Sequence, residues 1–322
     1  MPVNQFSNYP GGFSHGVTIR GVPVLTVADG NSWYVDSGSG NDSGAADGTI
    51  TKPFATLDYA IGRATANNGD VIYLMAGHAE TITNSTGMAW DVAGISIVGL
   101  GTGTTRPTFT FTTANTARIG VTADNISVDN CIFIGNFLSI ATCFLVGAAA
   151  DFSVNNCAFR DTSAVLGFLT IVTTTVSTNS DGLTFTNNLV RSDATTTPGP
   201  AVSILNTIRR VNVSYNYVVH TVASNNISAL IEHAALVVDE LLCAWNYVYS
   251  INTDTATGAI LVKTTATTGS GLIMHNRIRA QDVAAAIVVT AAAVQYGMFD
   301  NLYTGETTLL SGFVLPAIAT DA

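Results

Sequence analysis

Charged side chains are scarce in this chain of 322 residues: they make up 11% of it, against about a quarter in ordinary globular domains. Disorder, coiled coils and long amphipathic helical bundles all need far more Glu, Lys and Arg, so the composition excludes them. Free protein surfaces are usually richer in charge. We therefore expect other subunits to cover much of this surface.

Basic residues are rarer than acidic ones. The chain has 12 Lys and Arg against 22 Asp and Glu, which gives a net charge of −10. Its lysines are Lys52 and Lys263, and its best basic cluster is the single pair Arg209 and Arg210. A nucleic-acid-binding surface needs a larger cluster of Lys and Arg. We expect no nucleic-acid partner.

Long hydrophobic runs and paired metal ligands are also missing. The most apolar stretch, 284–294, is too short to cross a bilayer, and the first residues lack the basic start and apolar core of a signal peptide. We expect no membrane partner and synthesis in a reducing cytoplasm. The four cysteines show neither CxxC spacing nor a paired His, so we expect no zinc and no other cofactor.

The chain does contain an internal repeat. Seven segments align: ISVDNCIF (126–133), FSVNNCAF (152–159), LTFTNNLV (183–190), VNVSYNYV (211–218), LLCAWNYV (241–248), GLIMHNRI (271–278) and YGMFDNLY (296–303). An eighth, ISIVGLGT (95–102), fits more weakly. Apolar and polar residues alternate within each, as in strands with one buried face. A unit of 25 to 31 residues built this way predicts an all-β parallel β-helix of about eight coils.

The sixth position of the repeat predicts a stacked ladder. It is occupied by Cys131, Cys157, Asn188, Asn216, Asn246, Asn276 and Asn301. Amides carry donors and acceptors that can bond along a stack, and Asn tolerates the left-handed backbone of a sharp turn. Small thiols suit the same buried column. A disulfide between Cys131 and Cys157 is the alternative to two free thiols.

A second column precedes the strands and carries charge. Arg209 and Arg210 fall between Asp181 on one coil and Asp239 and Glu240 on the next. The pattern favours an ion-pair ladder that holds the register between coils. A carbohydrate-binding patch is the alternative.

Residues 31–94 differ from the repeats and predict a cap. A helix is expected to start after Thr51, to bury Phe54, Leu57, Ile61 and Ala64, and to stop at 67–69. Such a helix, followed by the strand VIYLM, would cover the open end of a β-helix. The coils then occupy residues 95–305.

The run YVDSGSGND…GT…KPFATLDYAI…NGDVIYLMAGHAET resembles the N-terminal cap of right-handed parallel β-helix proteins related to pectate lyases. The opening NQFSNYPGGFSHGVTIRGVPVL, joined to this cap, is similar to uncharacterised structural proteins of bacteriophage virions, including head-decoration proteins. The resemblance implies a right-handed parallel β-helix and a place in a virion. It says less about the role, because this fold serves both enzymes and structural proteins.

The two ends of the chain are expected to make subunit contacts. Residues 1–30 have too few periodic apolar positions to build a core, so they predict an extended arm that docks on a partner through Phe6, Tyr9, Phe13 and Arg20. Residues 306–322 are apolar and broken by Pro316, as in a second cap or a subunit contact.

One polar cluster is a candidate for chemistry. Asp161 and Asp193 fall on successive coils, close to Arg160, Arg191 and Ser192. Two carboxylates facing across a groove could cleave a polysaccharide. A neighbouring column reads Gly135, Asp161, Ser192, His220 and Ser250, in which the acid adjoins the serine and not the histidine. That order is wrong for a catalytic relay, so hydrogen-bonded turn residues are the favoured interpretation.

Other candidate sites are weaker. Asp36, Asn41, Asp42 and Asp47 share one loop and could bind calcium, but they miss the EF-hand spacing, and we expect no metal. Three tryptophans, Trp33, Trp90 and Trp245, are expected to be core or interface anchors before sugar platforms.

These observations predict a phage virion protein that is not an enzyme: a decoration, or cement, protein that binds the major capsid protein on the outer capsid surface as a homotrimer. The alternative is a tail spike or receptor-binding protein with polysaccharide depolymerase activity. In that case Asp161 and Asp193 would carry glycosidase or lyase chemistry, and a glycan would be the partner.

Overall fold

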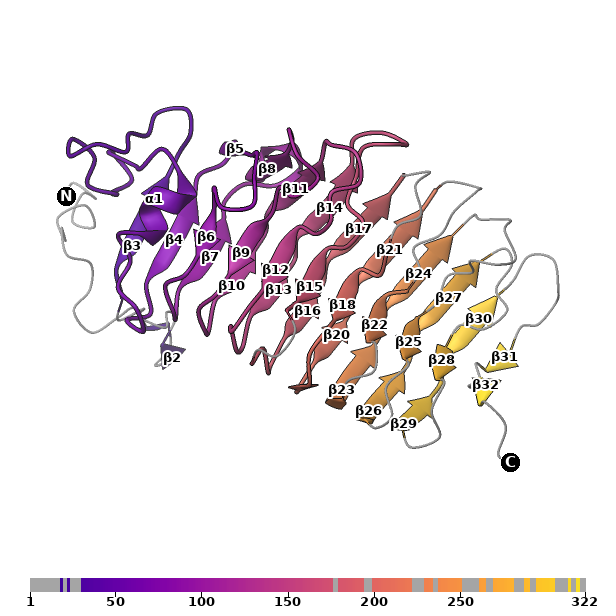
Figure 1. Cartoon of the computed structure of the whole chain (residues 1–322). Coiled ribbons are helices and arrows are strands. Elements are labelled where there is room, and N and C mark those ends of the chain that lie inside the picture. The colour runs from indigo at the N-terminus through magenta and orange to yellow at the C-terminus, as the bar shows by residue number, and fades with distance from the viewer. Residues whose placement is uncertain are drawn as a thin grey trace.

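The computed structural model of the protein describes residues 18–19, 22–23, 30–175, 179–193, 199–221, 229–233, 237–250, 261–264, 269–280, 287–289, 294–304, 312–313 and 317–318. Strands stack along one axis, with β3 (Ser32–Val35) toward one end of the stack and β30 (Leu302–Thr304) toward the other (Figure 1). The expected all-β parallel β-helix is confirmed. No helix among these residues has the length and hydrophobicity of a membrane span.

Three sheets, here called I, II and III, form the sides of the solenoid. Sheet I has eleven strands. They are β3 (Ser32–Val35), β4 (Val71–Leu74), β7 (Ser96–Gly99), β10 (Ser127–Asp129), β13 (Ser153–Asn155), β16 (Thr184–Thr186), β20 (Asn212–Ser214), β23 (Val238–Ala244), β26 (Gly269–Met274), β29 (Val294–Phe299) and β19 (Ile208–Arg209), which pairs with β23.

Sheet II has ten strands and follows the turn after each strand of sheet I. They are β5 (Ala79–Ile82), β8 (Thr108–Phe111), β11 (Ile132–Gly135), β14 (Ala158–Asp161), β17 (Leu189–Ser192), β21 (Tyr217–His220), β24 (Tyr247–Ser250), β27 (Arg277–Ala280), β30 (Leu302–Thr304) and the antiparallel β31 (Gly312–Phe313).

Sheet III closes each coil with nine strands. They are β6 (Ala89–Trp90), β9 (Ile119–Val121), β12 (Phe144–Val146), β15 (Val172–Thr174), β18 (Val202–Ile204), β22 (Ile231–His233), β25 (Val262–Thr264), β28 (Ile287–Val289) and β32 (Ala317–Ile318). A separate hairpin joins β1 (Thr18–Ile19) to β2 (Val22–Pro23).

The register between coils follows the repeat. Its third position pairs in parallel from Ile97 through Val128 to Met298, and its seventh from Ile132 to Leu302. The weak eighth segment departs after Gly99, because a 3₁₀ turn at Gly103–Thr105 delays the next strand until Thr108. The coil count differs slightly from the expected eight, and β3 and β4 of the cap region also join sheet I.

The cap helix is shorter than the sequence pattern predicts. Helix α1 runs from Leu57 to Ile61, and Thr56 is its N-cap. The Asp42 carboxylate accepts hydrogen bonds from the backbone N–H of Ala55 and from the Thr56 hydroxyl, which holds the preceding segment in a non-helical turn. Local capping chemistry therefore overrides the apolar spacing that begins at Phe54.

Asp70 ties the first coil together. Its buried carboxylate accepts from the backbone N–H groups of Asn31 and Thr65 and from the side chains of Asn68 and Trp33. Burial acts to raise the pKa of Asp70, but these donors outweigh it and lower the pKa to about 2.

The sixth repeat position forms a continuous buried ladder. The Oδ1 atom of each Asn accepts the backbone N–H of the residue one coil earlier, at 2.9–3.1 Å, and each Nδ2 donates to a strand carbonyl, at 2.8–3.0 Å. The left-handed residue is the one before the ladder, such as Asn187 or Tyr215, so the expected left-handed conformation belongs to the preceding position. Cys131 and Cys157 continue the column as free, buried thiols.

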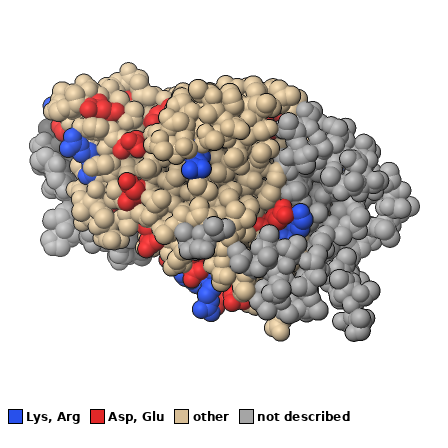
Figure 2. Space-filling view, viewed as in Figure 1, with Lys and Arg blue, Asp and Glu red and all other residues tan. Residues whose placement is uncertain are grey.

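The charged column is an ion-pair ladder on the surface. Arg209 lies 3.7 Å from Glu240, and Arg210 lies 3.2 Å from Asp151. The second contact passes over Gly182, where an added Cβ would come within 2.0 Å of the Asp151 carboxylate. Figure 2 shows how few charged side chains the described surface carries on the face in view.

Candidate functional site

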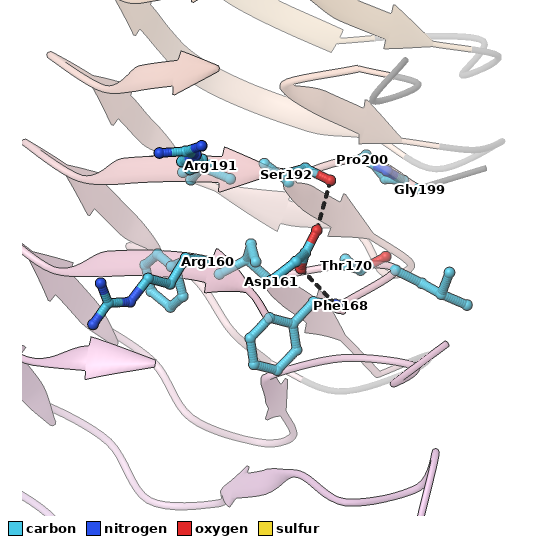
Figure 3. Close-up of a pocket in the computed structure, with 13 residues that line it drawn as sticks. Arg160, Asp161, Phe168, Thr170, Arg191, Ser192, Gly199 and Pro200 are labelled. Carbon is cyan, nitrogen blue, oxygen red and sulfur yellow. Dashed lines mark hydrogen bonds between the residues drawn. The ribbon is translucent and has the colours of Figure 1, made fainter. Parts of the chain in front are cut away.

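The outer face of sheet II carries the polar cluster singled out in the sequence. Side chains alternate along β14 and β17, so that Phe159 and Val190 point into the core while Arg160 and Arg191 are exposed. The two arginines pair directly in the register of the sheet. Figure 3 shows them on adjacent strands, next to Asp161 and Ser192.

Asp161 is held in place by three donors. Its Oδ2 accepts from the Ser192 hydroxyl at 2.9 Å and from the backbone N–H of Asp193 at 3.1 Å. Its Oδ1 accepts from the backbone N–H of Phe168 at 3.1 Å. Burial raises the pKa of Asp161 to about 6, against these hydrogen bonds, which favour the ionised form.

The space beside Asp161 is small. A cavity between β14, β17 and the segment 199–201 offers about 20 Å³ to the centre of a water molecule, enough for about one water. Gly167 is essential to this packing, because a Cβ there would lie 2.2 Å from Asp161 Oδ1. The cavity admits a water molecule but no sugar ring.

Asp193 is the more accessible of the two carboxylates, with 30% of its side chain exposed. Its Oδ2 lies 3.2 Å from Arg191 Nε, and the Thr221 hydroxyl donates to Oδ1. The structure thus brings Asp161 and Asp193 together through the backbone N–H of Asp193. Asp193 shares the exposed surface of Arg191, whereas Asp161 lies on the inward parity of Phe159 and is largely buried.

The neighbouring column lies in the order predicted. Gly135 pairs with Asp161, and Ser192 pairs with His220, whose ring is buried. Ser192 donates to Asp161. The serine hydroxyl therefore bonds the acid directly, whereas in a catalytic relay the acid orients a histidine that takes the serine proton.

Sequence reasoning named Trp245 but missed the aromatic stacks around it. At the turn between sheets I and II, Tyr215 stacks on Trp245 with ring centres 5.0 Å apart and planes at 4°. Trp245 in turn stacks on His275 at 5.3 Å. Trp245 is not a core anchor, since 42% of it is exposed, and its role as an interface anchor stays a prediction.

A second aromatic row stands on the strands of sheet II. Tyr217 and Tyr247 stack at 4.8 Å and 4°. The signal was present in the repeat, because the fifth and seventh positions flank the buried Asn. The fifth lies in the turn and the seventh begins the strand of sheet II. In contrast, Trp90 is fully buried and Trp33 packs against the core.

Two other sets of expected residues contribute no site here. Phe6, Tyr9, Phe13 and Arg20, the expected docking residues of the arm, lie outside the described residues. The acidic loop is engaged in turns: Asp36 accepts from the backbone N–H of Gly38 and Asp47 from the Thr49 hydroxyl. No group of three metal-binding side chains occurs among the described residues.

Solved structures with a similar fold include carbohydrate-active enzymes. A pectin methylesterase from carrot is 11% identical, with a TM-score of 0.52 over 89% of this chain and 86% of that chain. A pectin methylesterase from Aspergillus niger is 14% identical, with a TM-score of 0.50 over 90% of this chain and 94% of that chain. No protein-family model and no curated protein sequence matches this chain.

At such low identity these similarities establish the fold, a pectate-lyase-like parallel β-helix, and confirm that part of the resemblance. They give no support for a phage origin, and the virion, capsid-surface and decoration expectations gain nothing from them.

Proposed function

We propose that this protein is polysaccharide-active and binds its substrate on the outer face of sheet II. The observation that carries the proposal is the in-register, exposed pair Arg160 and Arg191, with the partly exposed Asp193 carboxylate 3.2 Å from Arg191. Guanidinium and carboxylate groups on a flat, exposed strand surface suit the many hydroxyl and acidic groups of a polysaccharide. The similar folds that act on pectin support the same class of substrate.

Binding has more direct support than cleavage. A glycosidase needs an acid that keeps its proton near neutral pH and a second carboxylate across the scissile bond. The pKa of about 6 at Asp161 favours cleavage. However, both oxygens of Asp161 accept hydrogen bonds, and its cavity has room for about one water molecule. A bound sugar would therefore contact Asp193 and not Asp161.

Cleavage is therefore the second candidate function. In it, Asp161 would donate its proton, through a water molecule for which the cavity has room, to the glycosidic oxygen as its bond to the sugar breaks. Asp193 would contact the sugar and take a proton from the water that attacks the anomeric carbon. The capsid-decoration role, with its homotrimer and capsid partner, stays a prediction that rests on the low surface charge.

The test is a binding screen of the full-length protein against pectin and neutral plant and bacterial polysaccharides by affinity electrophoresis. We expect retardation by at least one polysaccharide and its loss in Arg160→Ala/Arg191→Ala. The control is Arg209→Ala/Arg210→Ala, which removes another exposed arginine pair beside sheet I. Equal retardation of both variants, or no retardation of the native protein, would overturn the proposal.

The same samples test cleavage. Release of reducing ends, or of unsaturated ends after elimination, should vanish in Asp193→Asn if this residue contacts the reacting sugar. Binding that persists without any release of ends would leave a carbohydrate-binding protein and dismiss the second candidate.

A further inference from the structure

A second arginine pair lies further along the outer face of sheet II. Arg277 and Arg279 are two residues apart on β27, so both are exposed on the same side of the strand. Tyr247 and Tyr249 occupy the paired positions on β24. The guanidinium carbon of Arg279 lies 5.4 Å from the centre of the Tyr249 ring, within the range of a cation–π contact.

These residues surround a cavity. It offers about 200 Å³ to the centre of a water molecule, ten times the space beside Asp161. Its lining is made by Tyr247, Arg277, Ile278, Arg279 and Leu302. A wall of leucine, isoleucine and a tyrosine ring, with two guanidinium groups at its edge, suits a ring-sized ligand that carries an anionic group.

The charges of the cavity favour an anion. Among the described residues Arg277 forms no ion pair, although the chain as a whole carries a net charge of −10. Like charges placed side by side on a sheet repel each other. A bound carboxylate would relieve that repulsion through charge-assisted hydrogen bonds.

The two arginine pairs stand at the ends of one continuous surface. From β17, which carries Arg191, the strands β21 and β24 lead to β27, a span of about 14 Å at the usual 4.8 Å between strands. The stacked rings of Tyr217 and Tyr247 lie between them. A chain of sugars running along the solenoid axis would therefore touch both pairs.

We infer that the cavity at Arg277 and Arg279 binds the carboxylate of an acidic sugar, so that the substrate is an acidic polysaccharide lying along the axis of sheet II. This inference rests on the proposed function, because the site at Arg160 and Arg191 would bind the other end of the same polysaccharide. The geometry that carries it is the ring-sized cavity edged by two guanidinium groups.

The experiment is calorimetric titration with acidic oligosaccharides of galacturonic acid and with their methyl-esterified, neutral counterparts of equal length. In Arg277→Gln/Arg279→Gln, affinity for the acidic oligomers should fall at least about tenfold, because hydrogen bonds to charged groups are strong. Affinity for the neutral oligomers should change little. Arg277→Lys/Arg279→Lys should recover part of the loss.

The control variant is Arg63→Ala, which removes another arginine stacked over a tyrosine ring, 4.8 Å from Tyr59 in the cap region. Titration with inorganic phosphate separates a general anion site from a sugar site. Phosphate binding as strong as that of the acidic oligomers would overturn the assignment to a sugar.

The outcomes separate the two proposals. If Arg277→Gln/Arg279→Gln binds with native affinity while Arg160→Ala/Arg191→Ala binds weakly, the cavity is not part of the binding site. That result would overturn the inference and leave the proposed function in place. Equal loss of acidic and neutral oligomers would contradict the carboxylate. Absence of binding by the native protein to every oligomer would remove both.

Discussion

The two halves of the solenoid place their longest aromatic stacks on opposite sides of the same backbone. In the N-terminal coils, strands β4 to β16, Phe109, Phe133 and Phe159 stack inside the core with ring centres 5.4 and 5.1 Å apart. In the C-terminal coils, strands β17 to β30, the stacked rings of Trp245 and Tyr247 stand outside.

The core changes in step. Phe159 pairs with Val190, and the same inward column continues through Val218, Val248 and Ile278. No Phe or Trp is buried beyond Phe185 among the described residues. Both halves keep the coil, because stacking requires an apolar residue inside each strand but not a particular one.

The two halves therefore use their aromatic residues differently. Aromatic rings in the N-terminal core bury large apolar areas and stabilise the coils. In the C-terminal coils the core uses smaller residues, and the rings are free to contact a ligand. The four arginines of sheet II then flank the exposed rings, as the binding proposal requires.

Phe133→Ala should give the largest effect and sharpen the comparison. Phe133 stacks between Phe109 and Phe159, so its loss opens a cavity in the core, at a cost of about 4 kcal/mol. The matched variant Val248→Ala, in the same inward column of the C-terminal coils, should cost about 2 kcal/mol. Denaturant unfolding followed by circular dichroism measures both, and equal costs would mean that the halves do not differ in core energetics.

Asn246→Ala should come next. It removes the acceptor of the Asn216 N–H and the donor to the Val213 carbonyl, which leaves both groups buried without a partner, at a cost of about 3 kcal/mol. Cys157→Ala, in the same column of the N-terminal coils, loses weak thiol contacts with the carbonyls of Asn155 and Val128. A comparable loss in both variants would contradict an amide ladder that stabilises mainly the C-terminal coils.

Asp161 lies between the two halves of the solenoid, where Phe159 pairs with Val190. We expect it to make the stability of the protein depend on pH. Its pKa of about 6 in the folded chain exceeds the usual value of 3.8 for an aspartate side chain, so the folded chain binds this proton more tightly. Its stabilising contribution is complete below about pH 4 and disappears as the pH rises through 6, a change of up to about 3 kcal/mol. Melting temperatures of the native protein and Asp161→Asn across this range test it, and identical profiles would assign the effect to another group.

Trp245→Ala should have the smallest effect on stability. Its ring is exposed and stacked, so its removal should cost about 1 kcal/mol, the value of an aromatic pair. Thermal unfolding measures the cost. A loss as large as that of Phe133→Ala would break the comparison, because the exposed row would then be as structural as the buried one.

Much of the fold could be predicted from the sequence, since the repeat aligned every coil from Ile126 onward in its true register. The start of the cap helix was less predictable, because it depends on hydrogen bonds from Ala55 and Thr56 to Asp42. No local sequence pattern links Asp42 to the helix. The carboxylate pair Asp161 and Asp193 was recognised, but the pKa of Asp161 depends on its burial, which raises it, and on a hydrogen bond from the backbone N–H of Phe168 in the following loop, which lowers it.

The sequence by itself determined the parallel coil, its register and the buried Asn column, because a period of two within a period of about thirty residues admits one way to bury the apolar face. Only the tertiary structure decided which rings are exposed and which charges are neighbours. Trp245 and Phe133 both sit in strand-like patterns, and the difference between a surface stack and a core stack arises where each coil turns, through contacts between residues about thirty positions apart.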